Sequence, residues 1–168
     1  SQTSAKIYAL VRGENQEEAE NKLSNQLAHY GLDHCIFESR VEVVLADIAK
    51  RRLGLPKKIW QDLSSSVDAI YHNGAYVHHL QSYDRMRDTN VGSVKDIIDL
   101  ATCDKLKRIH FISSKYSNFT AHSPNAFEGM PSISPPADFV SFGYTITKWA
   151  GEWLLWKAAQ SGVQVDIY

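Results

Sequence analysis

The sequence of 168 residues is long enough for one domain with a buried core. A formal net charge of -1 excludes the strongly basic surface that binds nucleic acid or anionic membranes, and no apolar run is long enough to cross a bilayer. No signal peptide opens the chain, and Cys35 and Cys103 form no metal or redox motif, so we expect a cytoplasmic protein.

Segments rich in β-formers alternate with helix-like segments along the chain. Apolar runs predict strands at residues 6–12, 40–45, 67–72, 108–113 and 163–168. Apolar residues at helical spacing predict helices at residues 14–30, 56–64, 91–101 and 143–160. This order predicts an α/β fold, a doubly wound, Rossmann-like parallel sheet.

Two further features bear on domain organisation. Residues 120–140 hold four of the five prolines, which predicts a long, mobile loop; its position between Ser114 and Tyr144 raises the hypothesis that it closes over substrate. The chain begins directly before one predicted strand and stops inside another, so we expect a fragment of a larger protein.

Several candidate binding residues follow predicted strands, at the edge where parallel sheets bind ligands. Gly74, between Asn73 and Ala75, would let the backbone approach a flat ligand, although a plain turn explains these three residues equally well. Arg12 has the planar fork that suits a ribose 2′-phosphate, or it is simply a solvated arginine. Asp47 follows the second predicted strand.

The candidate catalytic residues are Ser114, Tyr144 and Lys148. Tyr144 and Lys148 lie one turn apart on a predicted helix, so the ammonium is expected to lower the pKa of the phenol, as a proton donor requires. A serine hydroxyl could hold a carbonyl oxygen, and Ser113 competes with Ser114 for that role because successive strand residues face opposite ways. The Tyr-x-x-x-Lys spacing also arises by chance, and a strand-end serine often satisfies only the backbone.

Other residue types predict no further chemistry. The seven histidines, including His72, His78 and His79, show no zinc-site spacing, so we expect no metal. Trp149, Trp153 and Trp156 have helical spacing, which predicts packing in a core or domain interface rather than stacking on nucleic acid.

The chain resembles the thioester reductase domains of nonribosomal peptide synthetases, polyketide synthases and carboxylic acid reductases, which are extended short-chain dehydrogenases/reductases. The matching words are IYALVRG, RVEVVLADIAKRRLGLP, YHNGAYVHHLQSYDRMRDTNV, IHFISS and GYTITKWAGEWLL. They cover nearly the whole chain in the family's order. The resemblance implies NADPH-dependent reduction of an acyl or peptidyl thioester on a carrier domain of a multidomain synthetase, releasing an aldehyde or an alcohol.

The resemblance also implies residue roles. Tyr144 would donate the proton, Lys148 would support it and hold the nicotinamide ribose, and Ser114 would bind the carbonyl. The remaining positions would bind NADPH: Arg12 at the 2′-phosphate, Asp47 and Ile48 at the adenine, and Asn73, Gly74 and Ala75 along its middle.

The chain departs from the family's pattern in three places. The family's first strand and glycine-rich turn are missing before Ser1, and its substrate-binding part is missing after Tyr168. Gly92 and Ser93 break the pattern that follows Asn90 in the family. We therefore expect residues 1–168 to be a partial reductase domain that binds NADPH weakly and is inactive alone. A fatty acyl-CoA reductase, a nucleotide-sugar epimerase or dehydratase, and a non-catalytic interaction module remain alternatives.

Overall fold

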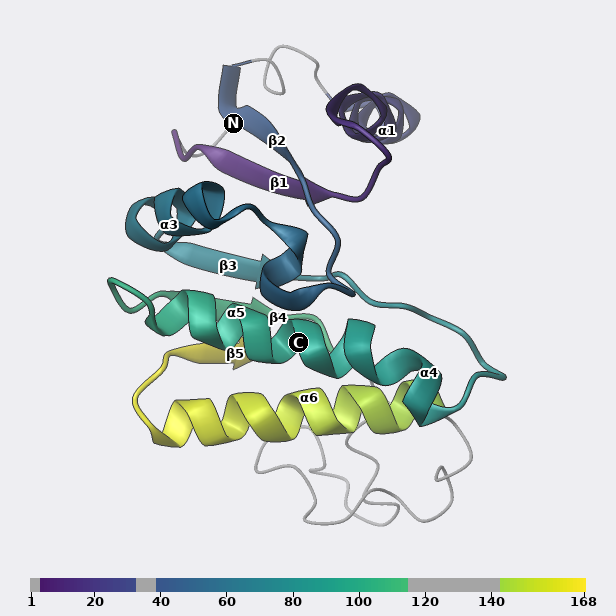
Figure 1. Cartoon of the computed structure of the whole chain (residues 1–168), viewed down its shortest axis with the longest axis vertical. Coiled ribbons are helices and arrows are strands. Elements are labelled where there is room, and N and C mark those ends of the chain that lie inside the picture. The colour runs from purple at the N-terminus through teal and green to yellow at the C-terminus, as the bar shows by residue number, and fades with distance from the viewer. Residues whose placement is uncertain (1–3, 33–38, 115–142) are drawn as a thin grey trace. The chain divides into compact units, whose positions relative to one another are not determined.

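The computed structural model describes residues 4–32, 39–114 and 143–168 (Figure 1). The chain divides into two compact units, Ser1–Asp47 and Ile48–Tyr168, and each is described by itself. The loop expected at residues 120–140 lies outside the described residues. Within the described ranges, no helix combines the length and apolar character needed to cross a membrane.

The first unit is a pair of parallel strands with a helix between them in sequence. β1 (Ile7–Val11) pairs with β2 (Val41–Leu45) along its whole length. α1 (Gln16–His29) begins after Asn15, whose side-chain oxygen accepts a hydrogen bond from the backbone of the first turn at 2.9 Å. Gly31 follows the helix with a φ of +64°, a left-handed conformation that suits glycine and ends the helix where the sequence predicts.

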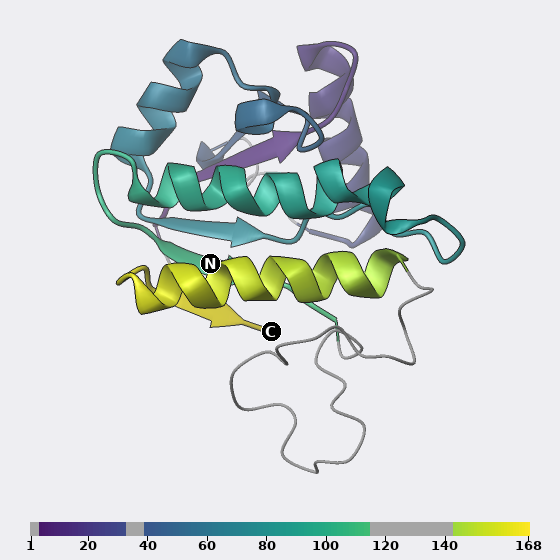
Figure 2. The same ribbon diagram turned by 60° about the horizontal axis from the view of Figure 1, so that its bottom comes forward.

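The second unit contains a three-stranded parallel sheet in the order β3-β4-β5. Its strands are β3 (Ala69–His72), β4 (Arg108–Phe111) and β5 (Val165–Ile167). α5 (Ser93–Thr102) connects β3 to β4, and α6 (Gly143–Gln160) precedes β5. These two helices lie side by side over one face of the sheet (Figures 1 and 2). Parallel strands with helical crossovers agree with the predicted α/β fold.

Shorter helical segments complete the second unit: η1 (Arg51–Gly54), α3 (Lys57–Ser66), α4 (Tyr83–Arg87) and the π-helical turn η2 (Asp88–Gly92). The helix predicted at residues 91–101 therefore begins earlier, because α4, η2 and α5 follow one another without a break. Residues 83–90 lack an apolar period, yet Met86 and Asn90 are buried, so tertiary packing rather than local pattern holds this stretch in the helix.

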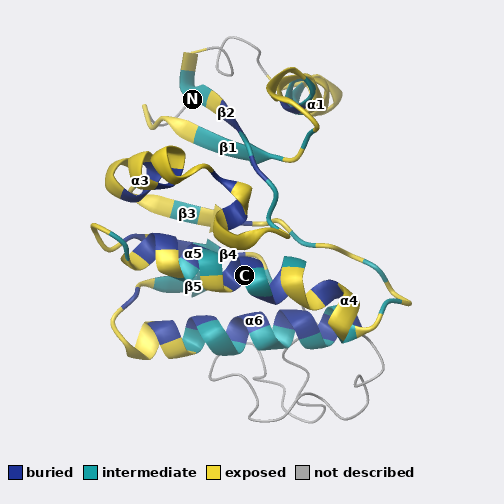
Figure 3. Cartoon of the chain, in the orientation of Figure 1, coloured by how far each residue is buried: buried dark blue, intermediate teal, exposed yellow. Residues whose placement is uncertain are grey.

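The core of the second unit lies between the sheet and its two covering helices (Figure 3). Along β4, Ile109 and Phe111 are buried, while the intervening His110 points to the opposite face and stacks on exposed Tyr71 at 4.3 Å. On α6, a Cβ at Gly151 would lie 3.3 Å from Val94 and 3.4 Å from Phe111. The missing side chain thus lets α6 approach both α5 and β4.

The tryptophans of α6 are half-buried, and their packing in a core or domain interface stays a prediction. Trp153 and Trp156 meet edge to face at 5.2 Å, and the Lys157 ammonium lies over both rings. The buried positions of α6 instead carry mostly small or polar side chains: Thr145, Thr147, Lys148, Gly151, Glu152, Leu155 and Ala158.

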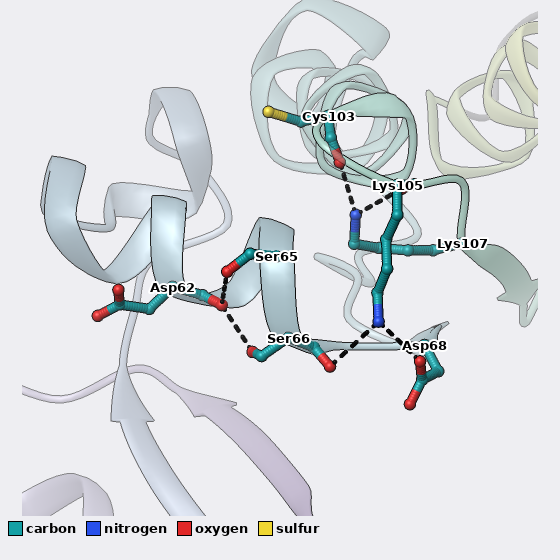
Figure 4. A network of polar contacts seen from close by, with 7 residues as sticks. All are labelled: Asp62, Ser65, Ser66, Asp68, Cys103, Lys105 and Lys107. Atoms are coloured by element: carbon teal, nitrogen blue, oxygen red, sulfur yellow. Dashed lines mark hydrogen bonds and ion pairs between the residues drawn. The ribbon is translucent and has the colours of Figure 1, made fainter.

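A polar network closes the amino-terminal end of β4 (Figure 4). Lys107 is 1% exposed, and its ammonium donates to the backbone oxygens of Cys103 and Lys105, both at 2.8 Å. Lys105 in turn pairs with Asp68 at 2.8 Å. Burial lowers the pKa of Lys107, while the carbonyl oxygens compensate its charge. This network caps the end of α5 and lies at the end of β4 away from the serine pair.

Candidate functional site

Tyr144 and Lys148 lie one turn apart at the start of α6, as the sequence predicts. Tyr144 is half-buried, and Lys148 is 4% exposed. The Lys148 ammonium donates a hydrogen bond to the Ile112 carbonyl oxygen at 2.7 Å and lies 4.7 Å from the centroid of the Phe111 ring. The lysine therefore joins the start of α6 to the end of β4, where the serine pair follows.

The electrostatics of this pair differ from the sequence-based expectation. Burial lowers the pKa of Lys148 to about 8, and the charge of Glu152 opposes this change. Burial raises the pKa of Tyr144. The expected lowering of the Tyr144 pKa by Lys148 is not found, because desolvation of the half-buried phenol disfavours the phenolate. Tyr144 thus keeps its proton at neutral pH.

The two serines after β4 have different surroundings. The Ser113 hydroxyl donates a hydrogen bond to the Glu152 carboxylate on α6. Its backbone N–H also bonds the Tyr168 carbonyl oxygen at 2.8 Å, so the sheet pairing continues to this residue. Ser114, the next residue, is half-buried. With Ser113 engaged by α6, Ser114 remains the candidate for binding a carbonyl oxygen, and that role stays a prediction.

His72, at the end of β3, is a buried neighbour of Lys148. Its Nε2 lies 3.1 Å from the Ser93 hydroxyl. Burial, and secondarily the charge of Lys148, lower the pKa of His72 to about 4, so the ring is neutral at physiological pH. In residues 4–32, 39–114 and 143–168, no group of three or more His, Cys, Asp or Glu side chains could hold a metal ion.

Three candidate cofactor-binding residues follow β3. Asn73 and Gly74 are exposed, and Ala75 is half-buried. A Cβ at Gly74 would lie 2.9 Å from the terminal methyl of Ile48, so Ile48 and Gly74 pack directly against each other. The structure thus brings Ile48 to the end of β3, and the role of these residues in binding a flat ligand stays a prediction.

Asn90 is a residue of this region that the sequence analysis did not place in the site. Its side chain bonds both backbone groups of Tyr76, accepting from the N–H at 2.7 Å and donating to the carbonyl at 2.9 Å. It also donates to the Thr147 hydroxyl at 3.0 Å, and that hydroxyl donates to the Tyr144 carbonyl oxygen at 2.7 Å. Asn90 lies in the π-helical turn, a feature common at functional sites, and it ties the segment after β3 to the first turn of α6.

Gly143 sets how closely α6 approaches the start of α4. A Cβ at this position would overlap the backbone of Gln81, Ser82 and Tyr83, at 2.6 Å from the last. Only glycine therefore fits directly before Tyr144.

The remaining candidates belong to the unit Ser1–Asp47. Arg12 is exposed directly after β1, and its carbonyl oxygen accepts a hydrogen bond from the Lys22 ammonium at 3.1 Å. Asp47 is half-buried two residues after β2. Both residues follow strand ends as predicted, and their roles in binding a cofactor stay predictions.

Comparison with known proteins identifies the family. The NAD-binding family model described as male sterility protein matches residues 1–168. L-2-aminoadipate reductase of Saccharomyces cerevisiae is 34% identical over 172 residues, which cover 96% of this chain and 12% of that protein. The terminal R domain of the myxalamid PKS-NRPS biosynthetic pathway is 34% identical, with a TM-score of 0.84 over 99% of this chain and 42% of that one.

A more distant structure supports the fold alone. UDP-glucuronic acid 4-epimerase from Bacillus cereus in complex with NAD is 14% identical, with a TM-score of 0.65 over 98% of this chain and 47% of that one. The predicted Rossmann-like α/β fold is thus confirmed. The chain belongs to the family of NAD-binding thioester reductase domains, which are oxidoreductases of the short-chain dehydrogenase/reductase type.

Proposed function

We propose that the protein containing this chain uses NADPH to reduce an acyl or peptidyl thioester carried on a phosphopantetheine arm. The product released would be an aldehyde, or an alcohol after a second reduction. The observation that carries the proposal is the buried Lys148, which links the helix start bearing Tyr144 to the strand end bearing Ser114. The similarity to the terminal R domain over 99% of the chain supports it.

In the proposed reaction, the chain's own groups handle the carbonyl oxygen and its proton. The Ser114 hydroxyl would donate a hydrogen bond to the thioester oxygen as negative charge develops there. Tyr144, whose raised pKa keeps it protonated at neutral pH, would give its proton to the same oxygen. The Lys148 ammonium would stabilise the resulting phenolate. Breakage of the carbon–sulfur bond would then release the thiol of the carrier and leave the aldehyde.

A bound nicotinamide cofactor would supply the hydride for the carbonyl carbon. The exposed backbone at Asn73 and Gly74, packed on Ile48, fits a flat dinucleotide. We propose NADPH rather than NADH because the exposed Arg12 guanidinium after β1 can pair with a ribose 2′-phosphate.

The carrier partner is also part of the proposal. This chain spans 12% of the yeast aminoadipate reductase and 42% of the terminal R domain, so the activity belongs to the whole protein. Residues 1–168 would then form part of an NADPH-binding reductase domain in a multidomain synthetase. A cytoplasmic location is supported by the two cysteines and their lack of a disulfide-type pattern.

The test is NADPH oxidation by the full-length protein with an acyl-pantetheine thioester, an acyl-CoA and a free aldehyde as substrates. Tyr144→Phe should lower kcat by roughly 10²- to 10⁴-fold with the thioester. Tyr30→Phe, at an exposed position after α1, should leave kcat unchanged. Reduction of acyl-CoA alone would redirect the proposal to acyl-CoA reductases, and full activity of Tyr144→Phe would remove Tyr144 from the mechanism.

A further inference from the structure

Glu152 is a buried carboxylate that the proposed reaction does not use. It is 5% exposed on α6, one turn after Lys148 and on the same face of the helix. The Ser113 hydroxyl donates a hydrogen bond to it from the end of β4. Carboxylates are rarely buried to this extent unless a partner compensates their charge.

The buried Lys148 ammonium needs a neighbour that can balance its positive charge. Its described neighbours are the neutral His72 from β3, the Phe111 ring and Ile112 carbonyl from β4, and Tyr144 and Glu152 from its own helix. Of these groups, only Glu152 carries a carboxylate, and its charge acts to raise the pKa of Lys148. Two opposite charges therefore lie one turn apart beneath the serine pair.

We propose that Glu152 is a positioning residue of the reductase site, whose carboxylate anchors Ser113 to α6 and balances the buried ammonium of Lys148. The effect of Glu152 on the reaction rests on the proposed function. The anchor fixes Ser113 toward the helix, and in the proposed reaction Ser114 is the serine that binds the substrate. The charge keeps Lys148 protonated, because a neighbouring anion opposes the loss of a proton caused by burial.

Two variants separate the anchor from the charge. Glu152→Gln keeps an oxygen that can accept from Ser113 but removes the charge, whereas Ser113→Ala keeps the charge but removes the donor. Asp99→Asn removes one negative charge from an exposed position of α5 and is the matched control. Glu152→Asp keeps the charge but withdraws the carboxylate from Ser113, so it tests the anchor if Glu152→Gln does not fold.

The first readout is the pH dependence of kcat in the full-length protein with NADPH and an acyl-pantetheine thioester. Wild-type kcat should fall above about pH 8, where Lys148 loses its proton. Glu152→Gln should move this decline to lower pH by about one unit. Ser113→Ala should lower kcat roughly tenfold at every pH, as misplacement of a catalytic group does, and should leave the pH of the decline unchanged. An unmoved decline in Glu152→Gln would overturn the charge-balancing role, and unchanged kcat in Ser113→Ala would overturn the anchor.

The second readout does not require turnover. NMR titration of the Lys148 ammonium should show a midpoint about one pH unit lower in Glu152→Gln than in wild type, and no change in Asp99→Asn. Equal midpoints in wild type and Glu152→Gln would overturn the proposal. A wild-type protein that does not reduce thioesters would refute the proposed function, and this titration would still decide the part that Glu152 plays.

Discussion

The Asn90 side-chain amide donates a hydrogen bond to the Thr147 hydroxyl at 3.0 Å, although the two residues are 57 positions apart in the chain. Because the same amide also bonds both backbone groups of Tyr76, one buried side chain connects the segment after β3 to α6, which carries Tyr144 near its start. The position of Tyr144 thus depends on a residue from the π-helical turn.

Asn90→Ala should destabilise the protein by about 3 kcal/mol, because the Tyr76 backbone groups and the Thr147 hydroxyl would lose their partner in the interior. Denaturant unfolding of the full-length protein measures this change. Lys95→Ala, at an exposed helix position nearby, should change the unfolding free energy by less than about 0.5 kcal/mol. Equal stability of the two variants would show that the Asn90 bonds contribute nothing.

Gly143→Ala should cost about 3 kcal/mol, because the added methyl would meet the backbone of Tyr83 at 2.6 Å and backbone cannot move aside as a side chain can. Gly92→Ala is the control. A Cβ there has as its nearest neighbour the Arg87 carbonyl oxygen at 3.9 Å, and the residue has helical backbone angles, so the change should be neutral or stabilising. Thermal unfolding distinguishes them, and a Gly143→Ala protein as stable as Gly92→Ala would contradict the close approach.

The stability of the fold should depend on His72 between about pH 6.5 and pH 4. Its folded-state pKa of about 4 lies below the ordinary value of 6.5, so the unfolded chain binds the proton more readily. The contribution is therefore complete above pH 6.5 and is lost as the pH falls toward 4, by about 3 kcal/mol. His72→Gln should lose this part of the pH dependence, whereas His29→Gln, at an exposed position of α1, should keep it. Identical pH profiles for wild type and His72→Gln would refute the assignment.

Arg12→Ala tests the cofactor preference. The variant should raise KM for NADPH by roughly 10- to 100-fold and leave KM for NADH nearly unchanged, because only NADPH carries the 2′-phosphate that a guanidinium would pair with. Lys6→Ala removes another exposed positive charge from the same unit and should affect neither KM. Parallel loss of both cofactors in Arg12→Ala would indicate a general structural effect instead.

The local pattern of the sequence predicts those parts of the site that depend on spacing along one element. The i, i+4 relation places Tyr144 and Lys148 on one face of α6, and strand alternation predicts that Ser113 and Ser114 face opposite ways. The parallel strands were predictable for the same reason, because each is a short apolar run followed by a turn or polar residue.

Contacts between distant segments were not predictable in this way. The bonds from Asn90 to Thr147 and from Ser113 to Glu152 join residues 57 and 39 positions apart, and no local period marks them. Burial also reversed the expected direction of the Tyr144 pKa, since desolvation depends on the packed surroundings and not on residue spacing. The buried face of α6 is built mostly from small and polar residues, which the helical spacing of its tryptophans did not indicate.

The two ends of β4 each bury a lysine, and their tolerance to substitution should differ in kind. The Lys107 ammonium donates to two backbone carbonyls, whereas the Lys148 ammonium donates to one, that of Ile112, and in the proposal above its charge is balanced by the Glu152 carboxylate one turn away. In a mutational scan of the full-length protein, replacements at Lys107 should reduce protein abundance and, with it, the total reductase activity. Replacements around Lys148 should leave protein abundance high and lower kcat. The scan would thus distinguish, at the two ends of one strand, residues that the fold requires from residues that the reaction requires.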